Sequence, residues 1–153
     1  MLKNNMKKIL IINGPNLNLL GSREKKFYGD TTLERIKSIC EEKCSESNIE
    51  MEFFQSNHEG ELLEKIHLVQ HGFDGIIINP AAYTHTSIAL LDALRATSKP
   101  KIELHISNIY SREDYRRKSI TSEAVNGVIC GFGENGYLLA IEAMEKLIYT
   151  DKK

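Results

Sequence analysis

Polar side chains that could carry out acid–base chemistry follow the apolar segments of this chain, at the points where those segments end. His58, His85 and His105, three of the five histidines, stand at such points. A histidine side chain titrates near neutral pH, so it can donate or accept a proton there. The complete polar set is Asn13, Asn16, Asn18, Asn57, His58, Glu59, Asn79, Tyr83, Thr84, His85, Glu103, His105, Ser107 and Asn108. This gathering favours an enzyme over an interaction module.

The apolar segments that must position these side chains alternate with helical patterns. Short runs of apolar, often β-branched residues predict strands over residues 8–12, 51–55, 75–79, 102–106 and 127–130. Apolar residues at helical spacing predict helices over about 33–44, 61–71, 87–96 and 136–149. The capping-box pattern from Thr31 to Glu34 precedes the first of these helices.

Strands that alternate with helices indicate an α/β fold, because neighbouring parallel strands require crossover connections. We expect a five-stranded parallel sheet with helices on both faces, in the flavodoxin-like, doubly wound order. Ligands of such sheets bind beyond the carboxyl ends of the strands. This fold therefore brings the polar set to one edge of the sheet.

The connection from the first strand to the first long helix spans residues 14–30. It is much longer than the usual strand-to-helix loop of about two to six residues. It carries a cationic cluster, Arg23, Lys25 and Lys26, beside the phenol of Tyr28. Two interpretations stay open on these residues alone: a lid over a ligand site at about 18–30, or a solvated mobile loop.

Composition limits the classes of protein that are possible. The chain has 153 residues, 41% of them hydrophobic and 27% charged, with a net charge of −1. This is typical of one globular domain, here residues 1–153, and gives no overall field that would attract nucleic acid or an anionic membrane. No apolar run approaches the roughly 20 residues that span a bilayer. We expect a cytoplasmic protein with no nucleic-acid or membrane partner.

Three further motifs each have an ordinary structural explanation. Cys40, Cys44 and Cys130 are too few for a disulfide scaffold or a thiolate zinc site, and the first two fit a buried helix face. The pattern GFGENG at 131–136 is a tight turn before the last helix or, less readily, a dinucleotide site. His67 and His71 have metal-ligand spacing but lack the glutamate of H-E-x-x-H, which favours an ordinary helix surface and predicts no metal.

Five stretches of the chain carry a family resemblance. They are INGPNLNLLG at 12–21, QSNHEG at 55–60, NPAAYTHTS at 79–87, ELHISN at 103–108 and GFG at 131–133. In this order and spacing, with Arg23, Glu24, Tyr28 and Gly29, they resemble the type II 3-dehydroquinate dehydratases. The resemblance extends from about Lys7 to Met144 and implies the flavodoxin-like fold.

The resemblance implies dehydration of 3-dehydroquinate to 3-dehydroshikimate without a cofactor, in the shikimate pathway or in the matching step of quinate breakdown. The reaction is an anti elimination through an enolate. Tyr28 looks like the general base, Arg23 like the group that tunes it, and His105 like the general acid. Glu103 would orient His105, and Asn16 would position a water at the enolate oxygen.

The resemblance also implies how the substrate is held and how the subunits assemble. Substrate-binding roles fall on Asn79, His85, Asp92, Ile106, Ser107 and Arg116. The expected assembly is a dodecamer of four trimers, in which Asp92 contributes to a neighbouring site. Departures from the family pattern at Leu91 and at Tyr110-Ser111 touch none of the assigned chemical groups.

Two other functions are compatible with a flavodoxin-like sheet. A flavin or nucleotide binder would need a phosphate-cradling loop after the first strand, and Gly14-Pro15-Asn16 lacks the necessary run of small residues. A response-regulator-like module would need an acidic pair there, and Asn13 is not acidic. Flavin absorbance and a phosphodonor assay would distinguish these functions.

Overall fold

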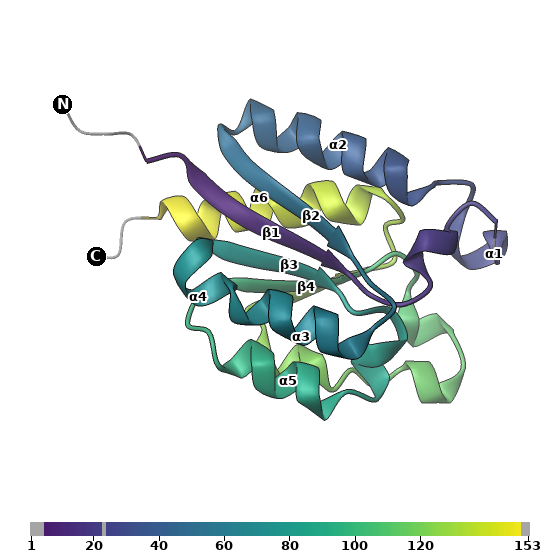
Figure 1. Ribbon diagram of the computed structural model, residues 1–153. Coiled ribbons are helices and arrows are strands. Elements are labelled where there is room, and N and C mark those ends of the chain that lie inside the picture. Colours follow the sequence, from purple (N-terminus) through teal and green to yellow (C-terminus); the bar gives the residue numbers. More distant parts are fainter. Residues whose placement is uncertain (1–4, 23, 151–153) are drawn as a thin grey trace.

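A computed structural model describes residues 5–22 and 24–150 and shows a parallel sheet between two layers of helices (Figure 1). The strands are β1 (Lys7–Asn13), β2 (Ile49–Gln55), β3 (Gly75–Asn79), β4 (Lys101–His105) and β5 (Gly127–Cys130). They are all parallel, in the order β2-β1-β3-β4-β5. The predicted flavodoxin-like fold is confirmed.

The helices connect successive strands and differ from the predicted ones mainly at their ends. They are α1 (Lys25–Tyr28), α2 (Leu33–Glu46), α3 (Glu59–His67), α4 (Val69–Gly72), α5 (Ile88–Arg95) and α6 (Asn135–Tyr149). The predicted helix over 61–71 is two helices, because the chain tightens at Leu68, whose amide donates to Lys65 rather than to the residue four before it. Short 3-10 turns surround the carboxyl edge: η1 (Leu17–Leu19), η2 (Ala81–His85), η3 (Ile109–Ser111), η4 (Asp114–Arg116) and η5 (Thr121–Ala124).

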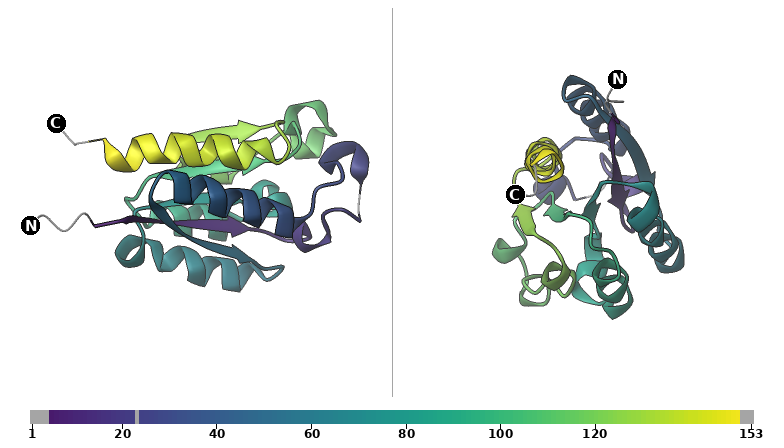
Figure 2. Two further views of the ribbon diagram at one scale, coloured as in Figure 1. Left: turned by 90° about the horizontal axis from the view of Figure 1, so that it is seen from above. Right: turned by 90° about the vertical axis from the view of Figure 1, so that its left-hand side faces the viewer.

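Two hydrophobic cores lie on opposite faces of the sheet, because successive strand residues point to opposite sides. Ile9 and Ile11 of β1 belong to the core under α2 and α6, whereas Leu10 and Ile12 pack toward α3 and α5. The views in Figure 2 show the two helix layers. All four residues have no exposed surface, as expected for a central strand of a covered sheet.

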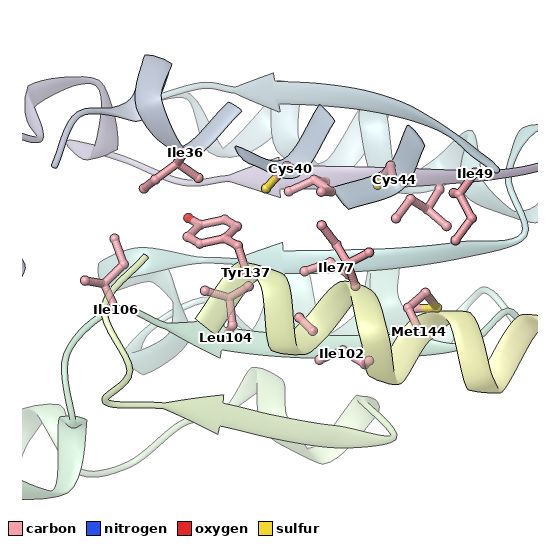
Figure 3. Packing of buried hydrophobic residues seen from close by; sticks show 14 of the residues in the cluster. Ile36, Cys40, Cys44, Ile49, Ile77, Ile102, Leu104, Ile106, Tyr137 and Met144 are labelled. Carbon is pink, nitrogen blue, oxygen red and sulfur yellow. The ribbon is translucent and has the colours of Figure 1, made fainter. Parts of the chain in front are cut away.

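The core under α2 and α6 contains the predicted buried cysteines. Cys40 and Cys44 face Ile77 and Met144 across this layer (Figure 3). Burial raises the pKa of the Cys40 thiol to about 12 and that of Cys44 to about 11, so both act as small apolar groups. Tyr137 of α6 also lies here, with its side chain fully buried.

The start of α2 differs from the capping-box prediction by one residue. Thr32, rather than Thr31, is the N-cap, and its hydroxyl accepts from the amide of Arg35 at 3.1 Å. The hydroxyl of Thr31 donates instead to Glu134 at 2.6 Å. A long-range partner at the start of α6 thus competes for the residue that local sequence assigned to the cap.

Two glycine-dependent turns shape the edge where the strands end. A Cβ on Gly14 would lie 2.4 Å from the carbonyl oxygen of Pro80, so only glycine allows the ends of β1 and β3 to approach. Gly131 and Gly133 adopt positive φ angles of 93° and 59°, which glycine adopts without a Cβ clash. The pattern at 131–136 thus forms the turn that leads into α6.

Candidate active site

A cavity at the carboxyl edge of the sheet gathers six of the predicted site residues. Its walls include Asn16, Tyr28, Asn79, His85, Ser107 and Arg116. The cavity is small, about 50 Å³. A more open cavity of about 590 Å³ shares Tyr28 and Ser107 with it and includes Ile106. We take the smaller cavity as the candidate site, because the predicted side chains converge there.

His105 and Glu103 form a buried pair at the end of β4. Residues two apart on a strand point to the same face, and Nε2 of His105 donates to Oε2 of Glu103 at 3.0 Å. Burial alone would raise the pKa of Glu103. Hydrogen bonds from His105, Thr121 and Ser119, together with the charge of His105, outweigh burial and lower the pKa below its ordinary value. Glu103 is therefore a carboxylate at neutral pH.

His105 is buried and is not among the residues that line this cavity. Its side chain is 6% exposed, and the neighbouring wall residue is His85, whose titration it influences directly. Burial lowers the pKa of His85, and the charges of His105 and Arg116 act in the same direction. Nδ1 of His85 lies 2.7 Å from the carbonyl oxygen of Lys118. Because a carbonyl only accepts, Nδ1 carries the proton and Nε2 is left as an acceptor.

Tyr28 lines the same cavity and is held by an arginine that sequence reasoning missed. Nη1 of Arg112 donates to the phenol oxygen of Tyr28 at 3.0 Å. The same guanidinium lies 4.0 Å from the centre of the Phe27 ring and 3.6 Å from the carboxylate of Glu24. Arg112 is 7% exposed. Its position just before the basic run at 115–118 was the one signal in the sequence that could have pointed to it.

Asn79 and Asn16 contribute polar groups at the ends of β3 and β1. The amide nitrogen of Asn79 donates to the phenol oxygen of Tyr137 at 3.0 Å, and its carbonyl oxygen accepts from the amide of Ala81 at 3.1 Å. The phenol of Tyr137 donates in turn to Asn13 at 2.6 Å. Asn16 has a positive φ of 67°, and its backbone amide donates to the side-chain oxygen of Asn57 at 2.9 Å. These bonds fix the turns that form the cavity floor.

The remaining predicted residues are placed differently. Ser107 lies on the cavity wall and Ile106 follows β4 directly, so their amides are at the site's edge. Arg116 is on the wall and forms an ion pair with Glu113 at 3.2 Å. Asp92 is exposed on α5 and is absent from the wall of this cavity. Arg23 lies outside the described residues.

Two negative findings concern the described residues 5–22 and 24–150. Within them, no group of three or more His, Cys, Asp or Glu side chains is arranged to hold a metal ion. His67 and His71 are both exposed and lie on separate helices, α3 and α4. Among the same residues, none of the helices is long and apolar enough to cross a membrane.

The sequence is similar to those of known proteins. A 3-dehydroquinate dehydratase from Caldicellulosiruptor saccharolyticus is 51% identical over 144 residues, 94% of this chain and 99% of that protein. One from Clostridium botulinum strain 657 is 53% identical over 147 residues, 96% of this chain and all of that protein.

Solved structures and a family model agree with these relatives. The type II dehydroquinase from Butyrivibrio crossotus is 50% identical and matches with a TM-score of 0.88, covering 90% of this chain and 97% of that one. The type II dehydroquinase from Propionibacterium acnes is 40% identical and matches with a TM-score of 0.89, covering 92% of this chain and 97% of that one. The family model described as dehydroquinase class II matches residues 7–145. The chain therefore belongs to the class II dehydroquinase family.

Proposed function

We propose that the cavity at the carboxyl edge of the sheet dehydrates 3-dehydroquinate to 3-dehydroshikimate, with Tyr28 as base and His105 as acid. The chain is a 3-dehydroquinate dehydratase, a hydro-lyase of the shikimate pathway. Relatives more than half identical over nearly their full length support the activity. One observation supports the mechanism above all: a phenol paired with a buried guanidinium lines the cavity, and an imidazole paired with a buried carboxylate acts on the wall residue His85.

Tyr28 takes the proton from the carbon next to the substrate's ketone. A free phenol has a pKa of about 10, so only about one in a thousand is ionised at neutral pH. The guanidinium of Arg112 donates to the phenol oxygen at 3.0 Å, so it can stabilise negative charge that develops on this oxygen during proton transfer. Arg23 is expected to add to this effect, and this remains a prediction from the sequence.

His105 gives a proton to the departing hydroxyl. The ionised Glu103 accepts from Nε2 and thereby fixes the ring, leaving Nδ1 for the substrate. Asn16, at the cavity wall, would hold a water against the enolate oxygen, because a developing negative charge needs preorganised donors. These roles need proton transfers and hydrogen bonds from protein groups and call for no cofactor.

Asn79, His85 and Arg116 would hold the hydroxyls of the substrate ring. The backbone amides of Ile106 and Ser107, together with the Ser107 hydroxyl, would bind the substrate's carboxylate. The cavity of about 50 Å³ is much smaller than the roughly 300–1,000 Å³ of ligand sites. A wall must therefore move to admit a six-membered ring. The segment at about 18–30, which carries Tyr28, is the lid that we propose, within one catalytic domain of residues 1–153.

The proposed assembly is a dodecamer of four trimers, in which Asp92 reaches a neighbouring subunit's site. Its exposure on α5, away from the cavity of its own chain, supports this role. Light scattering with an activity assay tests it, since a monodisperse monomer with full activity would exclude a shared site. The expected cytoplasmic location stays a prediction.

The deciding experiment mixes purified protein with 3-dehydroquinate and follows near-ultraviolet absorbance. The product is an enone-carboxylate, which absorbs there, whereas the substrate is not conjugated. We expect a steady rise with protein that has been treated with a chelator. No rise from folded protein would reject the proposed function.

A further inference from the structure

The carboxylate of Glu103 is surrounded by three hydroxyls that the mechanism above does not use. Ser119 donates to Oε2 at 2.8 Å, Thr121 donates to Oε1, and Oγ1 of Thr84 lies 3.1 Å from Oε1. Thr84 lies 2.7 Å from each of the other two hydroxyls. We call Thr84, Ser119 and Thr121 the hydroxyl cluster. Glu103, Thr84 and Thr121 have no exposed surface.

The direction of these hydrogen bonds follows from which atoms can only donate or only accept. A carboxylate oxygen only accepts, so Ser119 donates its hydroxyl proton to Glu103, while its Oγ accepts from the amide of Ser122 at 3.0 Å. Each oxygen of Glu103 then accepts at least one hydroxyl proton, and Oε2 also accepts from His105. A protonated carboxyl would turn one of these hydroxyls from a donor into an acceptor, and the hydrogen bond that stabilises the negative charge would be lost. The cluster therefore fits the carboxylate form.

The cluster stabilises the charge of Glu103 without neutralising it. Within residues 5–22 and 24–150, the ion-pair partner of Glu103 is His105, and the other groups around the carboxylate are hydroxyls. The other titratable or charged groups that act nearby are His85 from η2 and Arg116 from η4. The full negative charge thus remains available to a protonated His105.

The segment of residues 118–121, which carries Ser119 and Thr121, also holds the side chain of His85 in place. The carbonyl of Lys118 accepts from Nδ1 of His85 at 2.7 Å. Two residues later, the amide of Ile120 donates to the carbonyl of Thr84 at 2.7 Å, which joins the segment to η2. Residues 118–121 therefore position both histidines through one set of contacts.

We propose that Ser119 and Thr121, with Thr84, are positioning residues for the general acid. They hold Glu103 in one orientation as a carboxylate, so that it binds the Nε2–H of His105 and leaves Nδ1 for the departing hydroxyl. The proposal rests on the proposed function, because it assigns the cluster to the acid of that reaction.

Thr121→Val tests the proposal, because valine keeps the shape of threonine and removes its hydroxyl. We expect kcat to fall about 10-fold, the typical effect of losing a hydrogen bond to a buried charge, with KM nearly unchanged. The acid limb of the kcat profile should move up by about one pH unit, since Glu103 would be protonated more easily. Ser119→Ala should act in the same direction, and Thr121→Ser should restore the wild-type profile.

Two controls separate positioning from a general loss of stability. Thr97→Val removes another buried hydroxyl, which donates to Gln70 at 2.8 Å near the start of β4, and should leave kcat and its pH profile unchanged. In a Glu103→Gln background, adding Thr121→Val should change kcat less than about twofold, because the charge that the hydroxyl serves is gone.

A measurement without substrate keeps this test independent of the proposed function. The carboxyl carbon of Glu103, followed by nuclear magnetic resonance, should titrate at higher pH in Thr121→Val than in the wild type. Unchanged titration and unchanged kcat profiles in both Thr121→Val and Ser119→Ala would overturn the proposal. So would a loss of kcat that persists in full when Glu103 is glutamine. An inactive wild type with the expected titration shift would instead reject the proposed function.

Discussion

The proposed acid half of the site, His105 with Glu103, and the proposed base half, Tyr28 with Arg112, are built in different ways. His105 and Glu103 lie on β4, a strand with every residue buried, and the partners of Glu103 come from β4 itself and from two turns packed beside it. Tyr28 lies on α1, a four-residue helix with no buried residue, at the far end of the molecule beyond the strand ends (Figure 1). Its partner Arg112 is distant in the sequence.

This contrast assigns different tasks to the two halves. The acid is fixed by the fold, so its geometry exists before substrate arrives. The proposed base lies on the segment that we propose as the lid, and it pairs with Arg112 in the structure. We infer that acid function depends on buried hydrogen bonds, whereas base function depends on lid position and on cations beside the phenol.

The largest expected effect comes from removing the base. Tyr28→Phe should abolish measurable turnover, because it removes the hydroxyl that is proposed to take the proton from carbon. The variant keeps the ring, so melting temperature and circular dichroism should match the wild type. Turnover within about tenfold of wild type would show that another group is the base.

Removing the acid should have a smaller but still large effect. His105→Ala should lower kcat on the order of 10²- to 10⁴-fold, since water can protonate a leaving hydroxyl less well than a positioned imidazole. Binding should persist, because the substrate's carboxylate is assigned to Ile106 and Ser107. Isothermal titration with the product would check this. Weak binding with normal turnover of the bound fraction would make His105 a binding residue instead.

Removing the guanidinium of Arg112, which lies beside the phenol of Tyr28, should have the next largest effect on kcat. Arg112→Met keeps the apolar stem against Phe27 but removes the donor at 3.0 Å. We expect kcat to fall about 10- to 100-fold, and the limb of the pH profile governed by the base to move to higher pH.

Arg95→Met is the matched control, because its ion pair with Glu123 is on the surface, and it should leave the profile unchanged. From the sequence, Arg23→Gln should shift the limb governed by the base in the same direction as Arg112→Met. A wild-type profile in Arg112→Met would restrict Arg112 to packing the lid.

The sequence predicted the fold well because the signals for it are local. Apolar β-branched runs such as Ile9–Ile12 and Ile76–Ile78 identify central strands without knowledge of their neighbours. The N-cap of α2 was wrong by one residue because Thr31 has a partner more than a hundred residues away.

The candidate site was predicted less completely, for the same physical reason. Residue types at strand ends indicated histidines and amides, and the family resemblance added their roles. Arg112, Ser119 and Thr121 were missed because their importance depends on contacts across long stretches of chain, to Tyr28 and Glu103. No spacing rule connects an arginine in one loop to a phenol in another.

The smallest expected effect concerns stability and pH, and it tests whether the acid half belongs to the fold. The pKa of Glu103 in the folded protein is below its ordinary value. The unfolded chain therefore takes up this proton first as pH falls below about 4.5, so the stability that Glu103 contributes is complete above that pH and is lost as pH falls through the folded pKa.

Glu103→Gln lacks this contribution, so its melting temperature should lie roughly 5 °C below wild type at neutral pH, and the difference should narrow below pH about 4.5. His85, whose pKa is lowered by burial, weakens the fold as pH falls from about 6.5. Because the charge of Glu103 opposes this lowering, the weakening is greater in Glu103→Gln, so the gap in melting temperature should widen slightly before it narrows below pH about 4.5. The melting temperature of Tyr28→Phe should follow that of the wild type over this pH range, because the substitution leaves Glu103 and its hydrogen bonds in place. Calorimetry of the three proteins at several pH values measures this. A constant gap for Glu103→Gln would mean that Glu103 gains nothing from its hydroxyls, and the contrast between the two halves would then rest on geometry alone.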